Sequence, residues 1–181
     1  MKQRAVHSKA GQLALGLIAL LALPAIAVGG PRLDELPQAW HDDNGRPVAL
    51  NAHAGHRLVL TMAYARCHRI CPATIAALKR LQQSLDERGA SVDFVIVGYD
   101  PAHEDAASWR HYRAVHHLDR ANWSFLGGSR ADTERLAQQL GFEFWTYDEH
   151  VMHGSRVVVF DPSGVLVTAA DPTLPGWAAA L

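Results

Sequence analysis

The sequence Thr61-Met-Ala-Tyr-Ala-Arg-Cys67-His-Arg-Ile-Cys71-Pro72 contains both cysteines of this 181-residue chain, separated by three residues. A mostly apolar run over residues 58–64 leads into this stretch. Such a run predicts a strand in the protein core. The cysteines therefore follow directly on a core strand, and the segment after them decides what kind of site they form.

A helix is predicted after the second cysteine, over residues 72–88. Pro72 suits the first helical turn, because its missing N–H would have no partner there. Gly89 ends the pattern. Between the two, apolar residues recur at helical intervals: Ile75, Leu78, Leu81 and Leu85. Cys71 is expected at about the N-cap, with Cys67 in the loop before it. Backbone N–H groups and the helix dipole stabilise a thiolate there, the form that attacks disulfides and binds soft metals.

Two other interpretations of the cysteines stay open. They could form a small structural disulfide, since bridged Cα atoms lie roughly 4.4–6.8 Å apart. The loop closed would be very short, so such a disulfide would stabilise the fold weakly. They could also be inert buried thiols, for which a helix N-terminus after a strand is an unusual position. Functional thiol chemistry is the favoured interpretation.

Residues 1–27 are predicted to form an export signal or an N-terminal membrane anchor. A basic start precedes an apolar run over residues 13–28, and Ala25-Ile26-Ala27 has the small-x-small pattern of a signal peptidase site. The apolar run of about 16 residues is shorter than the roughly 20 that span a bilayer, which favours cleavage over a retained anchor. Either way the rest of the chain is expected in an extracytoplasmic space, the periplasm, where disulfides persist.

The remainder suits one compact domain. Residues 28–41 are predicted as a linker and residues 42–181 as the domain. The formal net charge is −1 and no basic run is present, so a nucleic-acid partner is not expected. The chain has 11 histidines, which is a weak indication of metal handling.

Strands alternate with helices along the domain. The predicted segments are a turn at 42–45 feeding a short strand, a strand at 92–98, a helix at 104–118 with Trp109, Tyr112 and Val115 on its buried side, a strand at 122–126 with Gly127-Gly128 as the turn, a helix capped by Ser129 and ending at Gly141, an extended segment at 142–147, a hairpin of 156–160 with 165–168, and a short helix at 177–181. This order predicts an α/β sandwich with a mixed central sheet flanked by helices. A dithiol at a strand–helix junction in such a pattern is typical of a thioredoxin-like fold.

A histidine is the expected third ligand of a metal site built on the cysteines. Two thiolates alone favour Cu(I), and an imidazole nitrogen helps to hold Cu(II) as well. His153 is the preferred candidate, because it precedes the strand at 156–160 and the loop before that strand faces the dithiol in a thioredoxin-like sheet. His68 and His150 are the alternatives, with ordinary surface roles as their default.

The chain resembles the Sco/SenC family from about Gly45 to Gly164. The matching elements are Asn44-Gly-Arg-Pro-Val, Cys67-x-x-x-Cys71-Pro72, Tyr99-Asp100-Pro101, Trp123-Ser-Phe-Leu-Gly-Gly-Ser129, His153-Gly-Ser and Val159-Phe-Asp-Pro-Ser-Gly164. The resemblance implies a thioredoxin fold, copper bound by Cys67, Cys71 and His153, and a role in assembling the copper centre of cytochrome c oxidase.

Two functions follow as hypotheses. The first is a copper metallochaperone that loads when the dithiol is reduced, with a cytochrome c oxidase subunit or another copper-accepting protein and a thiol-reducing protein as partners. The second is a thiol–disulfide oxidoreductase, in which Cys67 attacks and Cys71 resolves. His153 separates the two hypotheses, because thiol exchange does not need it. Whether the protein is an enzyme depends on this choice, and the metallochaperone is favoured.

Overall fold

The computed structural model describes residues 30–66, 70–148 and 150–179. In chain order the elements are η1 (Leu33–Glu35), β1 (Trp40–Asp42), β2 (Pro47–Val48), η2 (Leu50–His53), β3 (Leu58–Ala63), α1 (Ile70–Glu87), β4 (Asp93–Gly98), α2 (Ala106–Val115), β5 (Trp123–Gly128), α3 (Arg130–Leu140), β6 (Phe144–Tyr147), β7 (His150–His153), β8 (Val157–Phe160) and β9 (Leu166–Ala170).

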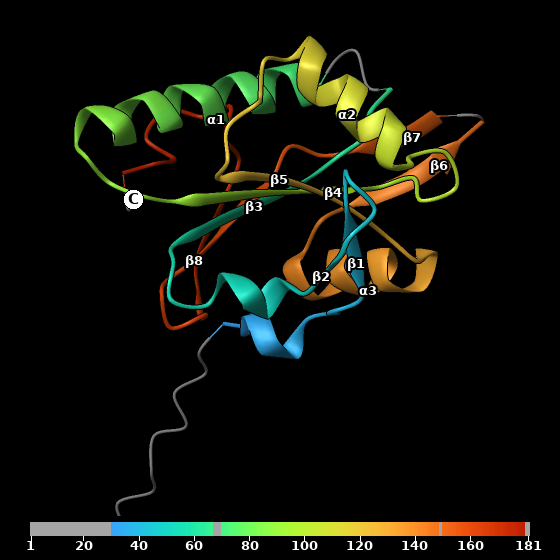
Figure 1. Ribbon diagram of the computed structural model, residues 1–181, viewed down its shortest axis with the longest axis horizontal. Helices are drawn as coiled ribbons and strands as arrows, with labels where there is room; N and C mark the ends of the chain where they lie inside the picture. The colour runs from blue at the N-terminus through green and yellow to red at the C-terminus, as the bar shows by residue number, and fades with distance from the viewer. Residues whose placement is uncertain (1–29, 67–69, 149, 180–181) are drawn as a thin grey trace, which may run out of the picture.

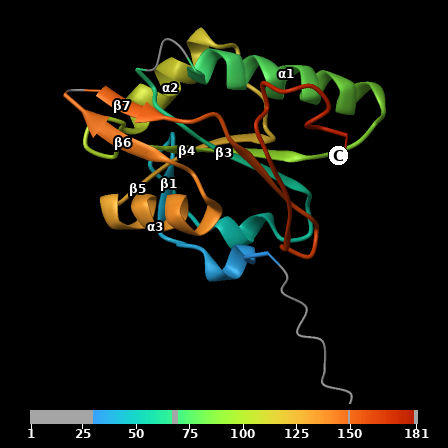
Figure 2. The same cartoon turned by 180° about the vertical axis from the view of Figure 1, so that it is seen from behind.

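A seven-stranded sheet in the order β2-β1-β5-β4-β3-β8-β9 forms the centre of the domain. Its middle strands β5, β4 and β3 run parallel, and the flanking strands β1 and β8 pair with them antiparallel. Helices α1 and α2 lie over one face of this sheet, and α3 lies on the other face with η1 and η2 (Figures 1 and 2). The predicted α/β sandwich with a mixed central sheet is therefore confirmed.

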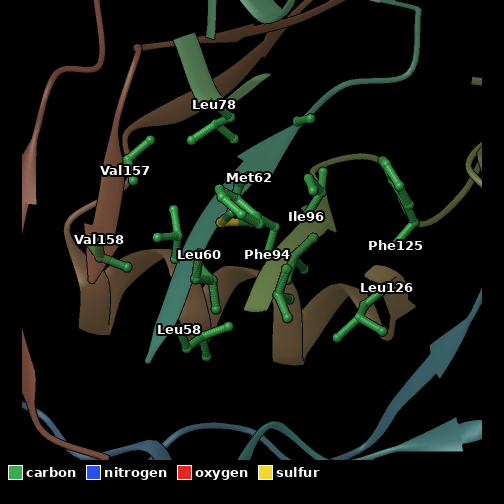
Figure 3. Packing of buried hydrophobic residues seen from close by; sticks show 14 of the residues in the cluster. Leu58, Leu60, Met62, Leu78, Phe94, Ile96, Phe125, Leu126, Val157 and Val158 are labelled. Carbon is green, nitrogen blue, oxygen red and sulfur yellow. The ribbon is translucent and has the colours of Figure 1, made fainter. Parts of the chain in front are cut away.

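The core is built on strands that are buried along their whole length. Every residue of β3 and of β8 is buried, as expected for strands covered on both faces. Figure 3 shows side chains from β3, β4, β5 and β8 in one cluster with Leu78 of α1. Continuous apolar runs in the sequence predicted these strands, and β3, β4 and the β8–β9 hairpin are confirmed.

The β3–β8 pairing places two distant segments together. Thr61 lies opposite Val157, and Leu58 lies opposite Phe160. The start of β8 is therefore beside the carboxyl end of β3, where the chain continues toward α1. This register decides which residues can meet the cysteine segment.

Three helix predictions need correction. Helix α1 begins at Ile70, so Cys71 lies in its first turn and not at the N-cap. Helix α2 ends at Val115, which is 56% exposed, so that residue is not on the buried side, while Trp109 and Tyr112 are buried as predicted. Residues 177–179 form turns in place of the expected final helix, and residues 180–181 lie outside the described residues. The start and end of α3 are confirmed at its Ser129 cap and at Gly141.

The predicted Gly127-Gly128 turn is instead the end of strand β5. These glycines pair with His41 and Trp40 of β1. A Cβ on Gly128 would lie 2.5 Å from Cε3 of Trp40, so only glycine lets the indole pack on this strand. Trp40 belongs to the segment expected to be a linker. In that segment Leu33, Leu36 and Trp40 are buried, because the chain adds strand β1 to the sheet.

A second, two-stranded sheet consists of β6 and β7. The extended segment at 142–147 was predicted and contains β6, but its partner β7 was not predicted. The hairpin lies at one end of the molecule in both views (Figures 1 and 2). Among the described residues, no helix has the length and apolar character needed to cross a membrane. The segment 1–27, for which a signal or anchor was predicted, lies outside the described residues.

Gly128→Ala is expected to destabilise the protein. The added methyl group must push against the buried Trp40 ring, which is also held by a hydrogen bond of 2.6 Å from Nε1 to the Pro37 carbonyl. Overpacking of this kind costs about 1–3 kcal/mol. Gly127→Ala is the matched control, because its Cβ would meet only the Glu104 carbonyl oxygen at 3.5 Å. Denaturant unfolding of both variants tests this. Equal losses in the two variants would contradict the proposed steric role of Gly128.

Candidate metal centre

Cys71 is fixed where strand β3 gives way to helix α1. The residue is 2% exposed, and its Sγ accepts a hydrogen bond of 3.3 Å from the backbone N–H of Tyr64, the residue after β3. Its place in the first turn of α1 also exposes the sulfur to the positive end of the helix dipole. Both effects stabilise a thiolate at Cys71.

His153 is the residue that strand β7 brings to this sulfur. Its side chain is buried, and its Nε2 lies 3.2 Å from Cys71 Sγ, although the two residues are 82 positions apart. Nδ1 lies 2.9 Å from the carbonyl oxygen of Gly154. Since a carbonyl can only accept, Nδ1 carries a proton in this contact, and Nε2 is the ring nitrogen that faces the sulfur.

The donor pair fits a soft or borderline metal ion. Donors bound to one ion at about 2.0 Å (nitrogen) and 2.3 Å (sulfur) lie about 3.5 Å apart at a tetrahedral angle. The observed 3.2 Å separation of Cys71 Sγ and His153 Nε2 requires only a small opening to reach that value. Among the described residues, no three histidine, cysteine or acidic side chains gather around one point. The predicted third donor, Cys67, lies outside the described residues, as does His68.

His150 does not reach this centre. It occupies the same strand as His153 but is exposed. Residues three positions apart on a strand point to opposite faces, so only one of these histidines can face Cys71. The strand character of 150–153, which was not predicted, thus decides between the two candidates on geometry.

Tyr99 forms the wall against which the imidazole packs. Its ring stacks on His153 at 4.8 Å between centroids, with 28° between the planes, and contacts Phe144 at 5.0 Å. Burial raises the pKa of the Tyr99 phenol, and the charge of Cys71 raises it further. The ring therefore stays neutral and keeps water from one side of the imidazole. In the sequence, Tyr99 stood out only as part of Tyr99-Asp100-Pro101 in the family resemblance, because no pattern shows which ring will meet the histidine.

Glu104 ties together the two chain segments that border the centre. It is 5% exposed, and its carboxylate accepts hydrogen bonds from the backbone N–H groups of Ala65 and Asp100, the latter at 2.9 Å. Asp100 also pairs with Arg66 at 3.3 Å. Burial raises the pKa of Glu104 to about 7, while the two backbone hydrogen bonds oppose the rise.

Little in the sequence indicates this role for Glu104. An acidic residue near a helix start suggests a cap, and the predicted helix at 104–118 included it. The cap is in fact Asp105, whose side chain accepts a hydrogen bond of 2.8 Å from the Ser108 N–H. Glu104 is thereby left outside α2 and turned toward the strand ends.

Residues 37–179 match the family model described as SCO1/SenC. A curated protein of Stutzerimonas stutzeri, named as a candidate copper-binding protein, is 27% identical over 143 residues, which cover 75% of this chain and 69% of that protein. A SCO1/SenC family lipoprotein from Bacillus anthracis str. Ames has a similar structure, with a TM-score of 0.73 at 19% identity over 80% of this chain and 89% of the other. ScoI of Arabidopsis thaliana, solved with copper bound, has a TM-score of 0.67 at 20% identity, over 80% of this chain and 88% of the other. The thioredoxin-like fold predicted for this chain is thereby confirmed.

Glu104→Gln is expected to remove a pH dependence from the stability of the protein. The folded-state pKa of about 7 lies above the ordinary value of 4.5, so the folded protein holds this proton more tightly than the unfolded chain. The resulting stabilisation is complete below the unfolded pKa and is lost as the pH rises through the folded one. Relative to the glutamine variant, the wild type should lose up to about 3 kcal/mol of unfolding free energy over this range.

Denaturant titrations of both proteins at a series of pH values between those two pKa values measure this difference. The unfolding free energy of the wild type minus that of the variant should fall steadily as the pH rises. If it is the same at every pH, Glu104 does not carry the raised pKa.

Proposed function

The chain belongs to the SCO1/SenC family, and from this premise we propose that it is a copper-binding metallochaperone whose ligands are Cys67, Cys71 and His153. The observation that carries the proposal is the 3.2 Å approach of Cys71 Sγ to His153 Nε2. Copper is here the cargo of the protein. The relatives that are named for copper support this choice of metal.

The donor set suits copper in both oxidation states. Thiolates are soft and favour Cu(I), and imidazole is a borderline donor that also suits Cu(II). The hydrogen bond from Nδ1 to the Gly154 carbonyl fixes the ring orientation and raises the basicity of Nε2. Tyr99 shields the ring from one side. These residues therefore prepare a buried donor pair, to which Cys67 adds a second thiolate.

The state of the two cysteines would control loading. Oxidation of both thiols to a disulfide releases two protons and two electrons and leaves no thiolate to bind copper. A thiol-reducing protein that returns the electrons would restore the site. We therefore infer two partners, a reductant and a copper acceptor. A subunit of cytochrome c oxidase is the proposed acceptor, on the basis of the family.

An extracytoplasmic location completes the proposal. Residues 1–27 would act as the export signal or the membrane anchor, and the domain would work in the periplasm. The similar SCO1/SenC family protein from Bacillus anthracis is named a lipoprotein, which fits this location.

Thiol–disulfide exchange remains a second candidate function because of the same geometry. Cys71 is buried and has His153 beside its sulfur, an arrangement that also suits a resolving thiol. Cys67 would then be the attacking thiolate. Metal binding by the reduced protein is the property that separates the two functions.

Replacing either cysteine is expected to abolish tight copper binding. Cys67→Ala and Cys71→Ala each leave one thiolate and one imidazole, which make a much poorer soft site. Titration of the reduced protein with Cu(I) against a competing chelator measures the affinity, and one tightly bound copper per wild-type chain is expected. Near-wild-type affinity in either variant would place the ligands elsewhere, and a reduced wild-type protein that takes up no copper would exclude the metallochaperone.

His153→Ala is expected to weaken Cu(II) binding most, while Cu(I) stays on the two thiolates. The loss should exceed the roughly 10–100-fold that removal of an outer-shell partner costs, because a direct ligand is lost. His150→Ala is the matched control on the same strand, and it should leave Cu(II) binding at the buried centre intact. Copper absorption spectra and the dithiol reduction potential are measured on both variants. A loss of Cu(II) in His150→Ala alone would reverse the ligand assignment.

A further inference from the structure

The β6–β7 hairpin has an outer face that the buried centre does not use. The register pairs Trp145 with Met152, and Tyr147 with His150. Directly opposed residues share one face of a two-stranded sheet, so these four side chains lie together. All four are exposed, including Trp145 at 57% and Met152 at 43%. The inner face instead carries Phe144, which is half-buried, and the buried His153.

Two of the exposed side chains are metal donors. Met152 has a thioether sulfur and His150 an imidazole nitrogen, and both suit a soft monovalent ion. They are two positions apart on one strand, about 7 Å between Cα atoms, so they point to the same side. Methionine has three rotatable bonds in its side chain and can bring its sulfur toward the imidazole. The pair can therefore bind one ion in a two-coordinate arrangement.

Among the described residues, neither donor has a polar partner. Within the described part of the chain, the His150 side chain takes part in no hydrogen bond or ion pair. Met152 is exposed although methionine ordinarily fills core space, as the buried Met62 does. The exposed indole of Trp145, directly across from Met152, adds a π face that attracts cations more strongly than any other aromatic side chain. A soft donor pair beside such a ring has the character of a Cu(I) site.

The position of this face relates it to the buried centre. Met152 and His153 are neighbours in strand β7, and they point to opposite faces of the hairpin. One donor of the outer face is therefore one residue away from a proposed ligand of the inner centre. The outer donors are neutral, whereas the inner centre has thiolates, so Cu(I) is held more tightly at the inner centre.

We propose that His150 and Met152, with Trp145 beside them, form an outer Cu(I) site from which the ion passes to the buried centre. The transfer is a ligand exchange: the bonds to the imidazole and the thioether break, bonds to the thiolates and His153 form, and copper stays Cu(I). The protons of the two thiols are released to solvent as the thiolates bind. The direction of transfer rests on the proposed function, but binding at the outer face does not.

The test uses the full chain with carbon-13 in the methionine methyl groups, of which there are three. Ag(I) serves as a redox-inert soft ion, and Cu(I) is added without oxygen in a parallel titration. In a Cys67→Ser/Cys71→Ser variant, which lacks the inner thiolates, the first equivalent should shift the Met152 methyl signal. The same titration of wild-type protein keeps the test valid if that variant misfolds. In wild type the first equivalent should fill the inner centre, and the second should shift the Met152 methyl signal.

Further variants separate the donors. Met152→Leu and His150→Gln should each weaken binding at the outer face by about tenfold or more, since a two-coordinate site loses one donor. His111→Gln, at an exposed histidine on α2, is the matched control and should change nothing. Trp145→Phe should retain the methyl shift and remove the accompanying change in tryptophan fluorescence.

Each result decides between the proposals. A Met152 methyl that does not move in either protein overturns the outer site. A shift that persists in His150→Gln at full affinity also overturns it. If the outer face binds Ag(I) while the wild-type thiols bind none, the metallochaperone proposal fails and the outer site stands. In protein that keeps Cys67 and Cys71, Met152→Leu should load the inner centre from a Cu(I) donor about tenfold more slowly than wild type, at unchanged final affinity.

Discussion

The contact between Cys71 Sγ and His153 Nε2 depends on a single feature of the sheet, the antiparallel register of β3 and β8. This pairing sets Val157 opposite Thr61, and the residues just before β8 then lie at the strand end from which α1 departs. Thr61 adds a hydrogen bond of 2.7 Å from its hydroxyl to the Arg156 carbonyl, which fixes the same junction with a side chain. A shift by one residue would turn every β8 side chain to the opposite face of the sheet. Such a shift would also break the hydrogen bond between Thr61 and the Arg156 carbonyl.

The polar groups around the centre are held by backbone hydrogen bonds more than by one another. Tyr64 donates to the sulfur, Gly154 accepts from the imidazole, and Glu104 accepts from two strand ends. Backbone partners of this kind are fixed by the fold and cannot rotate away. Cys71 and His153 are therefore already ordered without an ion, so binding one would cost little conformational entropy at these two residues. Arg66 and Asp100 lie at the more exposed edge, where an ion pair contributes less to the stability of the fold.

Sequence patterns predicted the parts of the fold that depend on local or periodic signals. Strands β3 and β4 are apolar runs, α1 has helical spacing, and α3 has a serine cap and a terminating glycine at φ 69°. The fold class and the candidate pair Cys71–His153 followed from these together with the family resemblance. The helix start at Ile70 was missed because Pro72 suits several positions of a first turn.

Features that depend on partners distant in sequence were not predictable. Gly128 is a strand residue because the Trp40 ring occupies the space of its missing side chain, and no local pattern contains that fact. Residues 33–40 are packed into the domain and are not a linker, since Leu33, Leu36 and Trp40 are buried and Trp40 begins strand β1. Strand β7 has mixed polarity because one face is buried and the other exposed, so its sequence shows no apolar run. Glu104 and Tyr99 act through contacts that only the packed strand ends create.

The 82 positions that separate Cys71 from His153 link metal binding to folding. A chain that has not yet paired β3 with β8 would have to close this long loop to hold one ion with both residues, at the full entropic cost of closure. The cysteine segment alone lacks the imidazole. A metal bound by both residues would thus favour the native over the unfolded ensemble by mass action. Metal occupancy would then report on completed folding, because the chain could bind an ion with both residues only after its sheet has assembled.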